Sequence, residues 1–244
     1  IINTNTKEIV FSLTMLVSFF SIFLSYNLFF IKNKNISFFQ EDILLLIYFI
    51  TLLIFFYLLF NFDYNFSVIL LSLVSSISNI GISLDQSPKN LSFIFLILII
   101  IGGSFVSTSS GIRLLKLYAL FKFAINNLIS HVKPKNIFLN KHFFLNISFE
   151  KDEISRYFLS VLIFIISLFI LTSLLTISGI SLESAFKLSI LTLMNTVNSS
   201  MHGLSDFNFQ ELQFFTKYYL IFFMIIGRVE LLTLLIICKK FLFK

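Results

Sequence analysis

The hydrophobic residues of this chain form long apolar stretches that alternate with shorter ones carrying serine, threonine and glycine. A helix of about 20 apolar residues, rising about 1.5 Å per residue, spans the roughly 30 Å hydrocarbon core of a bilayer. Stretches of this length cover residues 9–31, 43–60 and 154–178, and a further one, 212–238, is interrupted by Gly227 and Arg228. The pattern predicts an all-α membrane protein with several crossings.

Two other apolar stretches, 66–80 and 182–197, are too short and too rich in hydroxyl groups for ordinary crossings. We expect them to be re-entrant half-helices. Residues 91–129 are apolar but are interrupted by the glycine- and serine-rich segment 102–111. Irregular backbone at membrane depth persists only where it is buried in protein or lines a water-filled cavity, and its carbonyls can replace the hydration shell of a cation. Together these features predict an ion pore.

Composition supports the membrane assignment and excludes several other classes. The chain is 57% hydrophobic and only 12% charged, whereas soluble domains carry about 25% charged residues. Its single cysteine, Cys238, excludes an intrachain disulfide and a cysteine metal cluster. The sequence has no zinc-hydrolase, serine-hydrolase or phosphate-loop motif, and the net charge of +6 follows membrane topology, so we expect neither an enzyme nor a nucleic-acid binder.

Basic residues predict the orientation of the crossings. Segments 32–42 and 113–156, together with the C-terminus, hold 13 of the 18 lysines and arginines. Cytoplasmic loops are enriched in these residues, so the N-terminus of this segment is predicted outside and the C-terminus inside a cytoplasmic (inner) membrane. This multi-pass layout requires both short stretches to enter and leave on the same side, as pore loops do.

An internal repeat divides the chain. Residues 42–122 and 153–240 each run as a full helix, a half-helix and an interrupted exit helix. We therefore expect four parts: a preceding helix and link (1–40), one helix–pore-loop–helix unit (41–130), a cytoplasmic basic loop (131–153) and a second such unit (154–244). Two units of this kind are expected to be quasi-symmetric around a pore but not to enclose one by themselves.

Three motifs carry a resemblance to a known family. They are SSISNIG at Ser75–Gly81, IGGSFVSTSSGIR at Ile101–Arg113 and IGRVELLTLL at Ile226–Leu235. They resemble, in order, a filter segment, the glycine-rich intramembrane loop and the arginine-containing exit helix of the Trk/Ktr/HKT superfamily of potassium and sodium transporters. The match is closest to the C-terminal half of the bacterial Trk/Ktr (TrkH-like) membrane subunit. In that case the chain supplies the third and fourth of four repeats.

The resemblance implies uptake of potassium, with sodium as the alternative cation, and no cofactor. Expected filter residues, binding the ion through backbone carbonyls, are Asn79, Ile80, Gly81, Thr196, Val197 and Asn198. Expected gate residues are Gly102, Gly103, Ser104, Ser107, Thr108, Gly111 and Arg228. The implied partners are membrane lipid, the missing N-terminal half, a second copy in a homodimer and a cytosolic nucleotide-binding regulatory subunit.

Several residues allow a second interpretation. Gly81 could serve only as a turn, Asn79 could simply pack, and Arg228 could pair with Glu230 rather than act as a brake on cations. His202 is expected to be a solvated loop histidine, with a pH effect as the alternative. Asn198 stands where the family has glycine in the fourth filter segment. In the intramembrane loop, Val106, Ser109 and Ser110 stand where small or glycine residues are usual, which predicts a stiffer loop. At the level of the whole protein, the alternative is a non-conducting remnant or a structural membrane subunit.

Overall fold

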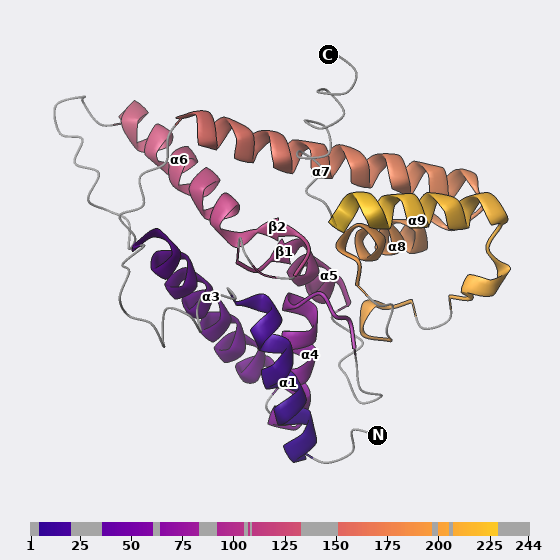
Figure 1. The fold of residues 1–244 in the computed structure, drawn as a ribbon, viewed down its shortest axis with the longest axis horizontal. Helices are drawn as coiled ribbons and strands as arrows, with labels where there is room; N and C mark the ends of the chain where they lie inside the picture. Colours follow the sequence, from indigo (N-terminus) through magenta and orange to yellow (C-terminus); the bar gives the residue numbers. More distant parts are fainter. Residues whose placement is uncertain are drawn as a thin grey trace.

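The computed structural model is an assembly of helices joined by turns and one pair of very short strands (Figure 1). It describes residues 5–20, 36–60, 64–82, 92–104, 107, 109–132, 151–196, 200–204 and 207–228. The elements are α1 (Asn5–Phe19), α3 (Ile36–Phe60), α4 (Phe66–Ile77), α5 (Ser92–Ile100), β1 (Ile101–Gly102), β2 (Ile112–Arg113), α6 (Leu114–Val132), α7 (Lys151–Ile177), α8 (Leu182–Met194), η3 (Ser200–His202), η4 (Phe209–Glu211) and α9 (Phe214–Arg228).

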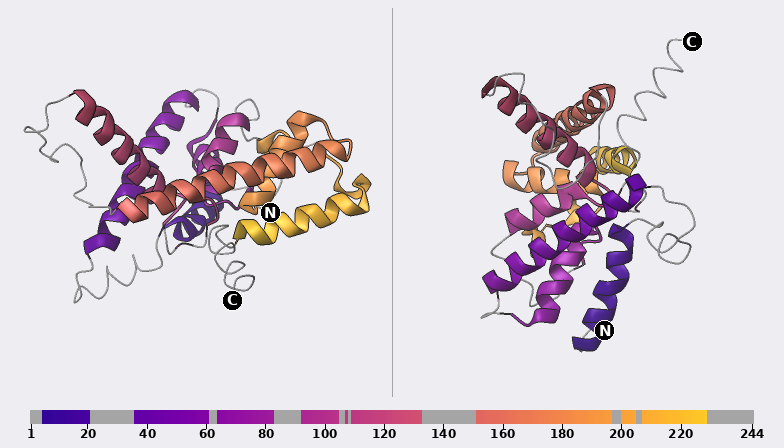
Figure 2. Two further views of the ribbon diagram at one scale, coloured as in Figure 1. Left: turned by 90° about the horizontal axis from the view of Figure 1, so that it is seen from above. Right: turned by 90° about the vertical axis from the view of Figure 1, so that its left-hand side faces the viewer.

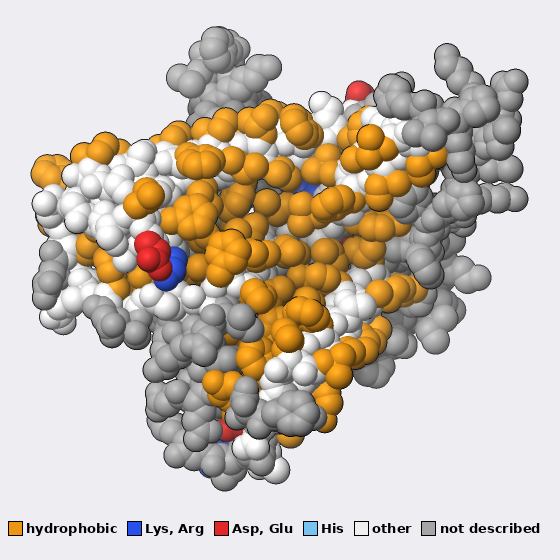
Figure 3. Space-filling view, turned by 180° about the vertical axis from the view of Figure 1, so that it is seen from behind, with side chains coloured by type: hydrophobic (Ala, Val, Ile, Leu, Met, Phe, Trp, Pro, Cys, Tyr) orange, Lys and Arg blue, Asp and Glu red, His pale blue; other side chains and the backbone are white. Residues whose placement is uncertain are grey.

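Two long helices match predicted crossings. Within the described residues, α3 and α7 are the helices whose length and apolar composition are sufficient to span a membrane, over Glu41–Phe60 and Asp152–Ile177. Both carry large apolar side chains on the outside, among them Leu58, which is 70% exposed, and Phe169, which is 64% exposed. Figure 3 shows how apolar side chains cover most of one described face. Such a surface is suited to lipid rather than water.

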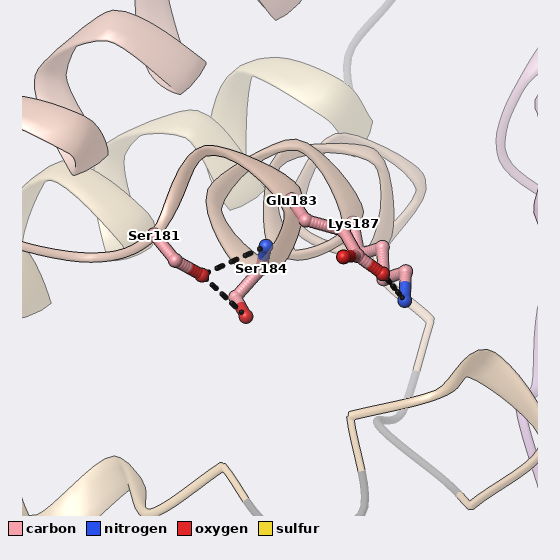
Figure 4. Close-up of polar contacts among 4 residues, drawn as sticks. All are labelled: Ser181, Glu183, Ser184 and Lys187. Carbon is pink, nitrogen blue, oxygen red and sulfur yellow. Dashed lines mark hydrogen bonds and ion pairs between the residues drawn. The ribbon is translucent and has the colours of Figure 1, made fainter.

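Two short helices occupy the positions of the predicted half-helices. Helix α4 has 12 residues and α8 has 13, so each is about 20 Å long and reaches only part of the way through a bilayer. All residues of α4 except Phe66 are buried. Ser181, the residue before α8, caps the helix: its hydroxyl accepts a hydrogen bond from the Ser184 N–H at 3.4 Å (Figure 4).

Each short helix lies in its own hydrophobic core, and α5 connects the two cores. Helix α4 packs against α1, α3 and α5, whereas α8 packs against α5, α7 and α9 (Figures 1 and 2). Phe95 and Leu98 of α5 belong to the core around α4, while Leu96 and Ile99 belong to the core around α8. Because α5 is apolar on all sides, it can bury opposite faces in both cores, and it fixes the two half-helices relative to each other.

Gly227 lies in the last described turn of α9, at the position where the sequence predicts an interruption of the exit helix. Helix α9 continues through Gly227 to Arg228. The glycine permits close packing, since a Cβ atom built on it would lie 2.0 Å from the backbone carbonyl oxygen of Leu193 in α8. A glycine in a helix costs about 1 kcal/mol relative to alanine, and here it allows the exit helix to touch the backbone of the half-helix.

Candidate functional site

The C-terminal end of α4 forms the first of two pore turns. Asn79 adopts a left-handed conformation (φ 60°), and so does Gly81 (φ 78°). The backbone N–H groups of Ile80 and Gly81 both donate to the carbonyl of Ser75, at 3.1 and 3.3 Å, which closes the end of the helix. Within the described part of the chain, no hydrogen bond reaches the carbonyls of Asn79, Ile80 or Gly81.

The second pore turn, at the end of α8, repeats this geometry. Asn195 is left-handed (φ 54°), and its N–H donates to the carbonyl of Thr192 at 3.2 Å. The N–H of Thr196 donates to the carbonyl of Leu191 at 3.0 Å, the same five-residue closure that Ile80 makes to Ser75. The two half-helices therefore end in the same motif. The predicted filter residues Val197 and Asn198 lie outside the described residues.

The hydrogen-bond patterns of the two turns match when Asn79 is aligned with Asn195. This pairing sets Gly81 opposite Val197, one residue before the Asn198 that the sequence motif aligns with it. The side-chain hydroxyl of Thr196 is buried and has no hydrogen-bond partner in the described part of the structure, and the same is true of the Ser75 hydroxyl. Each half-helix thus ends beside a buried hydroxyl oxygen. The negative end of each helix dipole also lies there, which favours a cation.

The segment 102–111 is a closed loop rather than a kink. Its ends pair as parallel strands, with Ile101 opposite Ile112 and Gly102 opposite Arg113. Glycine is required where the ends meet: a Cβ atom on Gly102 would lie 2.5 Å from the Ser110 carbonyl oxygen, and Gly111 has a φ of 102°. The loop therefore closes on itself between α5 and α6, where the sequence predicted an interrupted exit helix.

Arg113 organises the interior of this loop. Its Nη1 donates to the carbonyls of Ser104 at 2.7 Å and Ser109 at 3.0 Å, and to the Ser107 hydroxyl at 2.9 Å. The Ser109 hydroxyl in turn accepts from the Gly103 N–H at 2.9 Å. That the loop is stiffer than the loops of the family stays a prediction. The sequence motif contained Arg113, but nothing in its pattern identified this role.

The loop is also docked on the end of α1. The N–H of Ser104 donates to the carbonyl of Phe19 at 3.1 Å, and a Cβ atom on Gly103 would lie 2.2 Å from that same oxygen. The loop thus satisfies one of the carbonyls that a helix leaves unpaired at its C-terminus. Among the predicted gate residues, Gly102, Gly103, Ser104, Ser107 and Gly111 belong to this one structure, whereas Thr108 lies outside the described residues.

Comparison with known proteins assigns the chain to a family. The family model described as TrkH, cation transport protein, matches residues 82–242, which is well over half of the chain. The chain belongs to this family. Among solved structures, it is similar to the crystal structure of the potassium transporter TrkH from Vibrio parahaemolyticus, with a TM-score of 0.75 and 18% identity. That match covers 96% of this chain and 52% of the solved one, so the chain spans about half the length of this relative. No curated protein matches the chain.

Membership of the TrkH family confirms the helical membrane fold and the recognition drawn from the three motifs. A family of cation transport proteins also agrees with the expectation that the chain is not an enzyme. Arg228, the proposed brake, is the last residue of α9 that the structure describes, and its side chain lies outside the described part, as does Glu230. Its place one residue after Gly227 puts its backbone next to the contact with α8.

The expectation for His202 is wrong. The residue lies in η3, between the second pore turn and α9, and its side chain is fully buried. Burial lowers the pKa of His202 to about 4, so the imidazole is neutral at neutral pH. The neighbouring Met201 is also buried, and its sulfur lies 3.9 Å from the Ser76 hydroxyl of α4. The segment after the second pore turn therefore packs against the first half-helix and against α5.

Proposed function

We propose that the chain forms half of a pore that takes up monovalent cations, potassium first, across the cytoplasmic membrane. The observation that carries this proposal is the pair of pore turns. Two half-helices end in the same left-handed motif, and α5 holds them together in a chain of the TrkH cation transport family. In the first turn, the carbonyls of residues 79–81 accept no hydrogen bond from the residues that the structure describes. The similar crystal structure is that of a potassium transporter, which supports potassium as the cation.

In this proposal, segments 78–82 and 195–199 are filter segments. A half-helix directs its negative end toward the pore, and the carbonyls that follow replace the water around the ion. The intramembrane loop 102–111 and Arg228 form the gate below the filter. The four parts 1–40, 41–130, 131–153 and 154–244 serve as preceding helix, third repeat, cytoplasmic loop and fourth repeat. The N-terminus of this segment lies outside and the C-terminus inside.

The partners belong to the same proposal. The structural relative is about twice as long, so we expect two further repeats to complete the pore. We also expect a second copy in a homodimer and a nucleotide-binding regulatory subunit docked at the cytoplasmic loop 131–153. The alternative is a non-conducting remnant or a structural membrane subunit of such a transporter.

Uptake measurements test this function. The full-length reading frame that contains this chain is expressed in bacteria lacking their own potassium uptake systems, and purified protein is tested for rubidium uptake in liposomes. We expect growth on low potassium and selective uptake. This polypeptide alone should insert but conduct nothing, because its pore is half complete. Normal insertion of the full-length protein with no uptake would favour the non-conducting alternative.

A further inference from the structure

Both pore turns place an asparagine at the same position, and both asparagines reach out of the turn in the same way. Asn79 and Asn195 are the first left-handed residues after α4 and α8. The Nδ2 of Asn79 donates to the carbonyl of Ser110, at 2.6 Å, and the Nδ2 of Asn195 donates to the carbonyl of Met224, at 2.9 Å. Each side chain thus binds the backbone of the exit segment of its own repeat.

A left-handed position at the end of a helix is usually glycine and sometimes asparagine, so backbone preference alone could account for either residue. It does not account for the two matching contacts. Asn79 is only 6% exposed, and a buried side-chain amide needs a partner. The direction of the bond is fixed as well. If the amide were turned over, Oδ1 would lie against the Ser110 carbonyl oxygen at the distance of a short hydrogen bond. Both atoms are acceptors and would repel each other, so the orientation with Nδ2 toward Ser110 is the favourable one.

The contact of Asn79 joins two parts of the proposed pathway. Ser110 is the residue before Gly111, and its carbonyl oxygen is also the atom nearest to where a Cβ atom on Gly102 would lie, at the closure of the loop. The amide of Asn79 therefore attaches the first pore turn to the point that closes the intramembrane loop. Arg113 binds the loop interior at Ser104 and Ser109, so any displacement of Ser110 must break the bond to Asn79 or move the pore turn with it.

We propose that Asn79 and Asn195 are positioning residues that clamp the two pore turns to their exit segments, and that the Asn79–Ser110 clamp couples the filter to the intramembrane gate. This inference rests on the proposed function for its consequence in transport. The clamp itself is a structural contact, so it can be tested whether or not the protein conducts.

Substitution by glycine separates the two roles of the asparagine. Asn79→Gly keeps the left-handed backbone and removes only the amide. The matched control is Asn65→Gly, at the opposite end of α4, where the exposed asparagine makes no side-chain capping bond. Hydrogen–deuterium exchange is followed by mass spectrometry over residues 101–113 of the purified full-length protein, and uptake of rubidium and sodium is measured in liposomes.

We expect Asn79→Gly to speed exchange in the loop by roughly five- to tenfold, the factor that one lost hydrogen bond implies, while Asn65→Gly leaves it unchanged. Rubidium uptake should rise and its preference over sodium should fall. Unchanged exchange would overturn the clamp whatever the transport result. Faster exchange in a protein whose wild type takes up no cation would support the clamp and refute the proposed function. If Asn79→Gly does not accumulate, Asn79→Asp, which loses the donor but keeps the shape, carries the same test.

Discussion

Gly81 and Gly179 form a matched pair for testing the proposed filter. Both have left-handed backbone, with φ of 78° and 93°, and both follow a helix. Gly81 lies in the first pore turn, whereas Gly179 lies in the turn between α7 and α8, where a Cβ atom would meet nothing within 4 Å. The same change at both positions therefore places a side chain on left-handed backbone, and only Gly81 should affect the pathway of the ion.

The expected magnitudes follow from this difference. A side chain at a left-handed position costs about 1–2 kcal/mol, so Gly81→Ser and Gly179→Ser should lower stability by similar amounts. At Gly81 the turn can relieve the strain only by rotating the peptide whose N–H is bonded to Ser75, and this rotation moves the carbonyls of the turn. We expect at least about a tenfold loss of potassium selectivity, equivalent to ~1.4 kcal/mol of differential binding.

The assay is rubidium uptake by liposomes containing the full-length protein, with sodium as competitor and with uptake normalised to inserted protein. Thermal unfolding in detergent measures the strain separately. Gly179→Ser should lower the melting temperature but keep selectivity, whereas Gly81→Ser should lose selectivity at a comparable melting temperature. Equal transport effects at both glycines would remove Gly81 from the filter and leave it as a simple turn.

Three further predictions address the gate and the buried histidine. Arg228→Gln should insert normally and take up cations faster if the arginine is a brake; slower or unchanged uptake would contradict the brake, and failure to accumulate would favour an ion pair. Arg113→Gln should destabilise the protein by about 2 kcal/mol or more and raise cation leak, whereas Arg156→Gln at an exposed site on α7 should do neither. Burial lowers the pKa of His202 in the folded state, so between pH 6.5 and 4 the unfolded state binds a proton that the folded state does not. The free energy of unfolding should therefore fall by about 2 kcal/mol at pH 5 relative to pH 7. Melting temperatures of the His202→Gln variant should lack that part of the pH dependence.

The helices could be predicted from the sequence because length and polarity decide them locally. The apolar stretch 43–60 is long enough to cross a bilayer, and 66–80 is not, so one helix of each kind was expected and both are present. Segment 102–111 was likewise evident, since glycines and hydroxyls cannot face lipid. At Gly227 the sequence predicted an interruption, and that stays a prediction. What the sequence did not indicate is that this glycine permits contact with the backbone of α8.

The contacts that organise the site could not be predicted, because their acceptors are backbone carbonyls. Arg113 binds the carbonyls of Ser104 and Ser109, and Asn79 binds that of Ser110, 31 residues away. Any residue supplies a carbonyl, so no pattern of side chains marks the partner. His202 shows the same limit for burial. It lies in a short polar connection, and only the packing of η3 on α4 and α5 excludes it from water.

The pore region depends on residues that accept left-handed backbone. Asn79, Gly81, Asn195 and Gly111 have positive φ, and all four lie in a pore turn or in the loop between α5 and α6. Strain of this kind persists only where the surroundings hold it in place. Here the surroundings are the carbonyls of Ser75 and Leu191 and the guanidinium of Arg113. The turns and the loop are therefore the parts of the chain in which single substitutions should change transport before they change the fold.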